Sequence, residues 1–500
     1  MSEFVDVLVI GAGLSGINAG YRLQTEHPDK RYLILERREA IGGTWDLFRY
    51  PGIRSDSDMY TLGFSFRPWT KAQSIADGGD IRNYIEDTAR EFGIDRHIRF
   101  GHEVLSASWS SETATWTVEV RVRETGEVLS LRCRFMFACT GYYRYDHGYT
   151  PDFPGVSAFT AAGGVMIHPQ RWPEDLDCAG KRVVVIGSGA TAVTLVPALA
   201  ERGAEVTMLQ RSPTYILPRT SVDPLAERLP EQLPPQLAYD LLRWKNVLVG
   251  MALYNFCKRF PELARKLILE ATRRQLPEGY DIDKHFSPPY SPWDERLCIA
   301  PGGDLFTAIR EGRVEVVTDH IERFSEQGIV LESGRVLEAD IIVTATGLEL
   351  QVLGNMQLHV DGRPFDISQA TTYRGVMFSG LPNMAMAFGY INASWTLKSD
   401  LIARWVCRAL EALDARGADY IVPRRDDASA DDPPFVELRS GYIRRAIDLL
   451  PKQGPRAPWR ARQNYLLDLF EMRLAKIDDG SIEFCKRRPS VGGSDAQAAQ

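Results

Sequence analysis

The stretch FVDVLVIGAGLSGINAGYRL, residues 4–23, decides the fold. An apolar run typical of a buried strand ends at Gly11, Gly13 and Gly16, and apolar residues at helical spacing follow. A strand, a glycine-rich turn and a helix in this order are typical of a doubly wound α/β fold that binds a dinucleotide. Glycines let the backbone approach a pyrophosphate, which the free N–H groups of the helix start, near Ser15, can bind.

The next predicted strand supports this interpretation. It is YLILE, residues 32–36, and it ends in Glu36, 20 residues after Gly16. A carboxylate at this position accepts hydrogen bonds from ribose hydroxyls. A second glycine pair and Trp45 follow in residues 41–60, as expected for a loop that folds over a long, flat ligand such as a flavin. We therefore predict FAD here, with Gly43, Thr44 and Trp45 in its loop; plain core packing is the alternative for Trp45.

A second strand, turn and helix lies about 175 residues later, in RVVVIGSGATAVTLVPALA, residues 182–200. Its turn consists of Gly187, Ser188, Gly189, Ala190, Thr191 and Ala192. The following strand, residues 205–210, leads to Arg211 and Ser212 instead of to a carboxylate. A guanidinium attracts the 2′-phosphate that a carboxylate would repel, so we predict NADP(H) at this site. The alternative is that Arg211 is a solvated surface arginine.

Bulk properties exclude several other classes of protein. A chain of 500 residues with 44% apolar content exceeds one hydrophobic core, and its net charge of −7 argues against nucleic acid as a partner. The seven scattered cysteines form no Cys-x-x-Cys pair, which indicates reduced thiols and no metal site. A strand pattern begins almost at once, with no signal peptide, and no apolar run is long enough for a transmembrane segment. We expect a cytoplasmic protein.

The two turns predict two Rossmann-like domains, one inserted in the other. We assign residues 1–150 to the first part of the FAD domain and 151–350 to the NADP domain, which contains a helical insertion at about 216–290. Residues 351–488 would complete the FAD domain, and 489–500 form a polar tail without the apolar content needed for order.

The helical insertion contains an unusual segment, LLRWKNVLVGMALYNFCKRF, residues 241–260. Its apolar centre is flanked by Lys245, Lys258 and Arg259. Such a helix could associate weakly with a membrane surface. A packed helix near the substrate entrance is the interpretation that we favour.

Two fingerprints carry a resemblance to a known family. The first consists of Gly43, Trp45, Tyr50, Pro51, Gly52 and Asp56, and the second of Gly164, His168, Trp172 and Pro173, with Ala162 where an aromatic residue is usual. With these residues, the sequence resembles the class B flavoprotein monooxygenases of the Baeyer–Villiger type. It is similar to the subgroup of the ethionamide-activating monooxygenase, also in WDERLC (293–298) and GYINASWTL (389–397).

The resemblance implies an NADPH- and O₂-dependent enzyme. NADPH would reduce FAD, and a C4a-peroxyflavin would convert a small ketone to an ester or lactone, or transfer oxygen to the sulfur of a thioether. Relatives that oxidise soft heteroatoms end the second fingerprint differently, so Trp172-Pro173 favours ketones. The alternatives are a sulfide or amine oxygenase without ketone activity, and a nucleotide-binding redox sensor.

The resemblance also implies residue roles. Arg296 would supply a fixed positive charge to the site, oriented by Asp56, although Arg54 could be the partner of Asp56 instead. Val104 lies where relatives hold the FAD adenine through backbone groups. Many relatives have a lysine where this chain has Glu295, which leaves the NADP preference to Arg211. His168 and Trp172 would belong to an interdomain linker that positions the NADP domain, with simple packing as the alternative.

Overall fold

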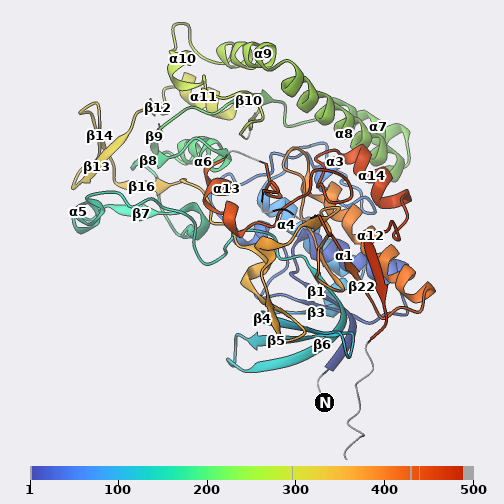
Figure 1. Ribbon diagram of the computed structural model, residues 1–500. Helices are drawn as coiled ribbons and strands as arrows, with labels where there is room; N and C mark the ends of the chain where they lie inside the picture. Colours follow the sequence, from blue (N-terminus) through green and yellow to red (C-terminus); the bar gives the residue numbers. More distant parts are fainter. Residues whose placement is uncertain (1–2, 296, 428, 430, 438–439, 488–500) are drawn as a thin grey trace, which may run out of the picture.

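The computed structural model describes residues 3–295, 297–427, 429, 431–437 and 440–487. Two sheets, each covered by helices, form the framework (Figure 1). The larger sheet has the strand order β18-β17-β4-β5-β6-β1-β2-β3, and β21 also pairs with β6. The smaller sheet has the order β12-β9-β8-β16-β7 and is parallel throughout. The predicted tail at 489–500 lies outside the described residues.

The strands of the larger sheet are β1 (Glu3–Ile10), β2 (Tyr32–Leu35), β3 (Ile98–Arg99), β4 (His102–Ser110), β5 (Thr115–Val122), β6 (Val128–Ala138), β17 (Gln357–Val360), β18 (Arg363–Phe365) and β21 (Met384–Met386). Those of the smaller sheet are β7 (Val165–Ile167), β8 (Arg182–Ile186), β9 (Glu205–Gln210), β12 (Val314–Thr318) and β16 (Ile341–Thr344). Short pairs and a hairpin sheet are formed by β10 (Ile216–Arg219) with β11 (Cys298–Pro301), β13 (Ile321–Ser325) with β14 (Gly328–Leu331) and β15 (Val336–Glu338), β19 (Thr372–Tyr373) with β20 (Met377–Phe378), and β22 (Tyr420–Pro423) with β23 (Ile482–Cys485).

The helices are α1 (Leu14–Glu26), α2 (Thr44–Leu47), α3 (Met59–Leu62), α4 (Gly78–Glu91), α5 (Val156–Ala161), α6 (Ala190–Glu201), α7 (Pro224–Gln232), α8 (Pro235–Arg259), α9 (Pro261–Arg273), α10 (Ile282–His285), α11 (Asp304–Arg310), α12 (Trp395–Ala415), α13 (Gly441–Arg445) and α14 (Tyr465–Leu474). Helices α7 to α10 follow one another between β10 and β11. Of the helices that the structure describes, none is long and apolar enough to cross a bilayer.

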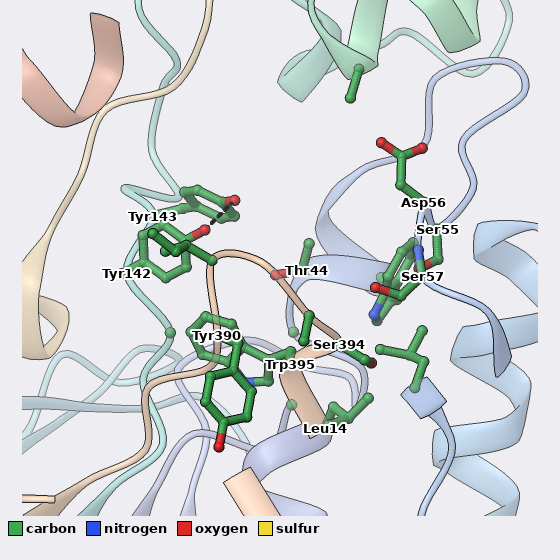
Figure 2. Close-up of a pocket in the computed structure, with 18 of the residues that line it drawn as sticks. Leu14, Thr44, Ser55, Asp56, Ser57, Tyr142, Tyr143, Tyr390, Ser394 and Trp395 are labelled. Carbon is green, nitrogen blue, oxygen red and sulfur yellow. Dashed lines mark hydrogen bonds between the residues drawn. The ribbon is translucent and has the colours of Figure 1, made fainter. Parts of the chain in front are cut away.

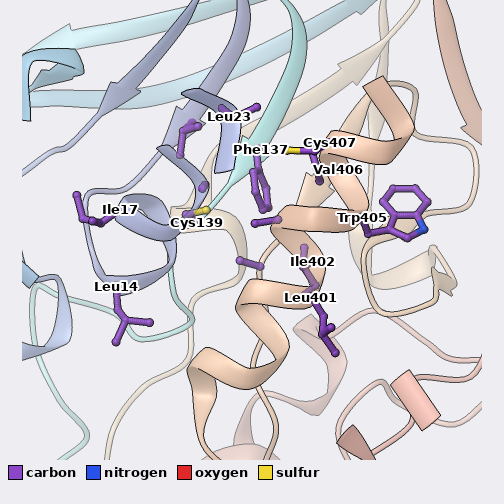
Figure 3. Packing of buried hydrophobic residues seen from close by; sticks show 14 of the residues in the cluster. Leu14, Ile17, Leu23, Phe137, Cys139, Leu401, Ile402, Trp405, Val406 and Cys407 are labelled. Carbon is purple, nitrogen blue, oxygen red and sulfur yellow. The ribbon is translucent and has the colours of Figure 1, made fainter. Parts of the chain in front are cut away.

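Segments far apart in the sequence build the first unit. Helix α1 packs against α12, and Ile17 of α1 and Ile402 of α12 are both fully buried in one core with Phe137 of β6 (Figure 3). Strand β21 lies parallel to β6, with Met384 opposite Met136. The chain therefore returns to the first sheet after completing the second.

A loop of the first unit belongs to the core of the second. Phe48 and Tyr50 are buried in the same apolar cluster as Val185 of β8 and Leu195 of α6. Gly52 has a φ of +73°, and a Cβ added to it would lie 2.7 Å from the Cβ of Ala198 on α6 and 3.0 Å from the carbonyl oxygen of Thr194. A residue with a side chain would therefore push the loop away from α6.

An ion pair joins the two units beside this contact. Nη1 of Arg54 donates to Oδ2 of Asp304, at the start of α11, at 2.5 Å. Both side chains are largely shielded from water, which strengthens the attraction between the charges. The loop from Phe48 to Arg54 thus holds the units together through apolar packing, a close backbone approach and a charge pair.

Replacing Gly52 with alanine tests the close approach. We expect Gly52→Ala to lower the free energy of unfolding by about 2–4 kcal/mol, because it adds left-handed backbone strain and a clash with α6. Thermal unfolding measures the loss. The matched control is Gly79→Ala in α4, where an added Cβ meets no atom within 4 Å. Equal melting temperatures for the two variants would contradict the packing role of Gly52.

Candidate functional site

A cavity of about 910 Å³ lies between the two units. It is lined by both glycine-rich turns, by α8 and by the segment before α12 (Figure 2). Pockets for small molecules and cofactors are usually 300–1,000 Å³, so this cavity is at the upper end of that range. Of the residues predicted for the site, the cavity is lined by Gly11, Gly13, Ser15, Glu36, Gly43, Thr44, Trp45, Asp56, Val104, Gly189, Ala190 and Thr191.

The three glycines of the first turn have two different structural roles. Gly11 has a φ of +103°, and a Cβ on it would lie 2.6 Å from the carbonyl oxygen of Cys139. A Cβ on Gly16 would lie 1.9 Å from the carbonyl oxygen of Gly11. Gly13 instead borders the cavity, and its Cβ position is 3.5 Å from the nearest atom, in Gly43. Two glycines therefore close the turn, and the third leaves room for a phosphate beside the helix start.

Glu36 is fixed at the end of β2 by two backbone groups. Its Oε2 accepts a hydrogen bond from the N–H of Ala12 at 2.8 Å, and its Oε1 accepts one from the N–H of Arg38 at 2.9 Å. Burial raises the pKa of this carboxyl, while the two N–H groups act in the opposite direction. A carboxylate oxygen has a further lone pair for a ribose hydroxyl, so the group fits the predicted role.

In the second turn, too, one glycine is packed against backbone and another leaves open space. Gly187 has a φ of +139°, and a Cβ on it would lie 2.4 Å from the carbonyl oxygen of Ala345. Ala192 is fully buried behind the turn. At Gly189, an added Cβ would meet no atom of the described chain within 4 Å. The second turn, like the first, is closed on one side and open toward the cavity.

Arg211 and Ser212 are exposed just after β9. The Oγ of Ser188 donates to the carbonyl oxygen of Ser212 at 3.0 Å, which ties the turn to this strand end. Burial raises the pKa of Glu295, and the charges of Arg444 and Arg211 oppose that shift. A carboxylate and two guanidinium groups therefore share the region where the sequence predicts the 2′-phosphate.

Asp56 lines the cavity and is visible in Figure 2 with Ser55 and Ser57. Arg296, its predicted partner, lies outside the described residues. Arg54 also lines the cavity, and its Nη1 is paired with Asp304. Its Nε and Nη2 are buried and have no hydrogen-bond partner within the described chain. From the sequence, Arg54 is expected only as a partner for Asp56, so these two free donors were not predicted.

Two protein families and several characterised proteins are similar to this chain in sequence. Residues 9–77 match the family described as NAD(P)-binding Rossmann-like domain, and residues 70–228 match Flavin-binding monooxygenase-like. The FAD-containing monooxygenase EthA of Mycobacterium tuberculosis is 56% identical over 493 residues, which cover 98% of this chain and 100% of that protein. EthA of Mycolicibacterium smegmatis is 53% identical over 99% of this chain and 100% of its own length.

The chain belongs to the FAD-containing monooxygenases.

Solved structures agree with this monooxygenase in fold. A steroid monooxygenase described as oxidized and bound to NADP has a TM-score of 0.75 at 24% identity, covering 97% of this chain and 100% of its own. A closed cyclohexanone monooxygenase has a TM-score of 0.68 at 24% identity, with coverage of 86% and 88%. The predicted family resemblance, and with it a flavoprotein that contains FAD, is confirmed.

Aromatic side chains that were not predicted form one wall of the monooxygenase's cavity. Tyr142 stacks on Trp395, with ring centroids 5.3 Å apart, and its hydroxyl lies 2.8 Å from that of Tyr143. Nε1 of Trp395 donates to Oγ of Ser15 at 2.8 Å. The run CTGYY at the carboxyl end of β6 was a usable signal, because ligands of such folds bind beyond the carboxyl ends of the strands.

The second fingerprint of the monooxygenase lies outside the cavity lining. Nε2 of His168 lies 3.0 Å from the carbonyl oxygen of Gly347, and Nδ1 accepts from the N–H of Gln170 at 3.2 Å. The imidazole thus joins β7 to the segment after β16 and needs to be neutral for both bonds. Trp172 is buried in the core of the second unit, just before Pro173.

An aromatic ring packs against Gly164 although position 162 is an alanine. A Cβ on Gly164 would lie 2.4 Å from the ring of Phe159, which is fully buried. Phe159 stands three residues before Ala162, about one helical turn, in α5. A ring from outside the fingerprint, that of Phe159, therefore packs against Gly164 in this monooxygenase.

The environment of His168 predicts a pH dependence of stability. Burial lowers its pKa, so below the unfolded value of about 6.5 the unfolded chain takes up a proton that the folded chain does not. Stability should therefore fall as the pH drops below this value. We expect the melting temperature of His168→Gln to fall less steeply than that of the wild type between pH 7.5 and 5.5. Parallel curves would show that His168 does not contribute.

Proposed function

We propose that this monooxygenase uses NADPH and O₂ to convert small ketones to esters or lactones and also oxygenates thioethers. The balanced reaction is ketone + O₂ + NADPH + H⁺ → ester + H₂O + NADP⁺. The observation that carries the proposal is the single cavity onto which both glycine-rich turns open. Electrons can pass directly between two cofactors only if both reach the same space.

Each turn fits one dinucleotide. FAD would be held at the first turn by the backbone at Gly13, the helix start near Ser15, the Glu36 carboxylate and the loop at Thr44. NADPH would be held at the second turn, with Gly189 and Thr191 beside its pyrophosphate and with Arg211 and Ser212 at its 2′-phosphate. When bound and reduced, FAD supplies the chemistry that activates O₂ for transfer.

The protein residues would orient the reactants, exclude water and stabilise negative charge. Arg296 is the proposed fixed cation, and Asp56 orients it. A guanidinium 4 Å from an anion contributes about 4 kcal/mol at an effective dielectric constant near 20. If most of this energy is gained in the transition state, it corresponds to roughly a thousandfold in rate. The side chains of Tyr142, Tyr143 and Trp395 would shield the reacting atoms from solvent.

Two observations support the proposed preference for ketones. Trp172-Pro173 ends the second fingerprint in the form that the resemblance associates with carbonyl oxidation. Structures of the same fold include a cyclohexanone monooxygenase, and cyclohexanone is a ketone. The nearer relatives are named only as FAD-containing or FAD-binding monooxygenases, so the choice between carbon and sulfur as the oxidised atom needs an assay.

Product analysis with purified, FAD-loaded protein tests the function. We expect NADPH- and O₂-dependent formation of a lactone from cyclohexanone and of a sulfoxide from methyl phenyl sulfide, each identified by gas chromatography. Sulfoxide without lactone would favour the heteroatom oxygenase. NADPH consumption that does not respond to either substrate would favour the redox sensor.

The variant Arg296→Ala tests the proposed role of this arginine in the same assay. The variant should still reduce its flavin with NADPH under anaerobic conditions, while lactone formation falls by about 10²–10³-fold. Unimpaired lactone formation would remove Arg296 from the proposed mechanism.

The coenzyme preference depends on Arg211. We expect Arg211→Ala to raise the KM for NADPH by about tenfold or more and to leave the KM for NADH unchanged, because a charge-assisted bond to the 2′-phosphate is lost. Steady-state oxidation of both coenzymes measures this. Arg363→Ala on β18, another exposed arginine, is the matched control. An equal change for both coenzymes would contradict the assignment.

A further inference from the structure

Helix α8 exposes an apolar stripe to solvent. Leu237, Leu241, Trp244 and Leu248 recur at intervals of four, three and four residues, which places them on one face of the helix. All four are exposed, Leu248 to 51%. The opposite face is buried and includes Leu242 and Asn246. Helix α8 therefore presents these four apolar side chains to solvent.

Helix α14 contacts α8 and carries a second group of exposed apolar side chains. The rings of Trp244 on α8 and Tyr465 on α14 are 6.0 Å apart, and both helices lie on the same side of the molecule in Figure 1. Leu467, Phe470 and Leu474 are exposed on α14, Phe470 to 70%. We call Leu241, Trp244, Leu248, Leu467, Phe470 and Leu474 the α8–α14 patch. A cluster of large exposed apolar side chains on neighbouring helices is a candidate binding surface.

The surroundings of the patch are positively charged. Residues 224–274 contain nine lysines and arginines but five acidic residues, in a chain whose net charge is −7. Within the described chain, the exposed cations Arg228, Arg259, Lys266 and Arg473 form no ion pair. An apolar face flanked by free cations is complementary to a bilayer surface with anionic headgroups.

Helix α8, which carries part of the patch, also borders the cavity. Val249 and Leu253 of α8 are exposed, Val249 to 56%, and both also line the cavity. Tyr465, which contacts Trp244, lines it as well. Helix α8 therefore carries part of the patch on one face and lines the cavity with another.

We propose that the α8–α14 patch docks on the surface of an anionic phospholipid bilayer, with α8 lying in the interface plane. The apolar side chains enter the headgroup boundary, and the flanking cations bind lipid phosphates. A second copy of the chain is the less suitable occupant, because a symmetric dimer through this face would place two surfaces of the same charge against each other. Apolar substrates dissolved in the bilayer would then reach the cavity along Val249 and Leu253.

Vesicle flotation of the FAD-loaded protein tests the docking without any turnover. The vesicles are phosphatidylcholine alone, or phosphatidylcholine with about one-third phosphatidylglycerol. We expect the protein to float with the anionic vesicles and to bind the neutral ones at least about fivefold less. High salt should weaken the binding to anionic vesicles.

Matched double variants identify the surface. Leu241→Glu with Phe470→Glu should lower the bound fraction by about tenfold or more, because two apolar side chains are replaced by anions. Val128→Glu with Val336→Glu introduces the same charge at exposed apolar sites on β6 and β15 and should bind like the wild type. Flavin absorbance and melting temperature confirm that each variant is folded.

Three outcomes would overturn the proposal. The folded protein could fail to float with anionic vesicles, or the two double variants could bind equally. Sedimentation could also show a dimer that the Leu241→Glu with Phe470→Glu variant abolishes, without vesicle binding, which would assign the patch to a second copy. The proposed reaction would stand in each case, because it is measured with water-soluble substrates.

Discussion

The contact between the loop Phe48–Arg54 and helix α6 is the constraint on which the site depends. The loop starts in the first unit, yet its aromatic residues are part of the core of the second. Only a glycine at position 52 allows the backbone to come this close to Thr194 and Ala198. The distance between the two dinucleotide turns, and with it the width of the cavity, is set by this packing.

The same loop connects the first glycine-rich turn, through the interface, to charged residues of the cavity. It begins beside Trp45, which lines the first turn, passes through the interface and ends at Arg54 and Asp56, which line the cavity. A shift of the second unit would therefore move the groups around the reacting atoms as well as the coenzyme. The imidazole of His168 bonds to Gly347, in the segment after β16, from outside the cavity.

The sequence predicts those parts of the site that are local. Both turns, the position of Glu36 and the strand before Arg211 follow from strand and helix patterns within about 30 residues, and in the structure each of them lies at the end of a strand or is a strand. The aromatic wall was missed because Tyr142 and Trp395 are distant in sequence and meet only through the pairing of β21 with β6. Phe159 was missed because a helical turn, not a fixed spacing, brings its ring over Gly164. The exposure of α8 likewise depends on which neighbours cover it, which periodicity does not specify.

The discontinuous first sheet imposes an order on synthesis. Strands β7 to β16 of the second sheet are contiguous in sequence, so this sheet can close as soon as residue 344 has left the ribosome. Strand β6 instead cannot pair with β21, and α1 cannot pack against α12, until these later segments have been synthesised. At translation rates of about 5–20 residues per second, that delay lasts roughly tens of seconds. During this time the nascent chain carries an incomplete flavin unit with an open strand edge, which makes it a natural client for chaperones that shield apolar surface.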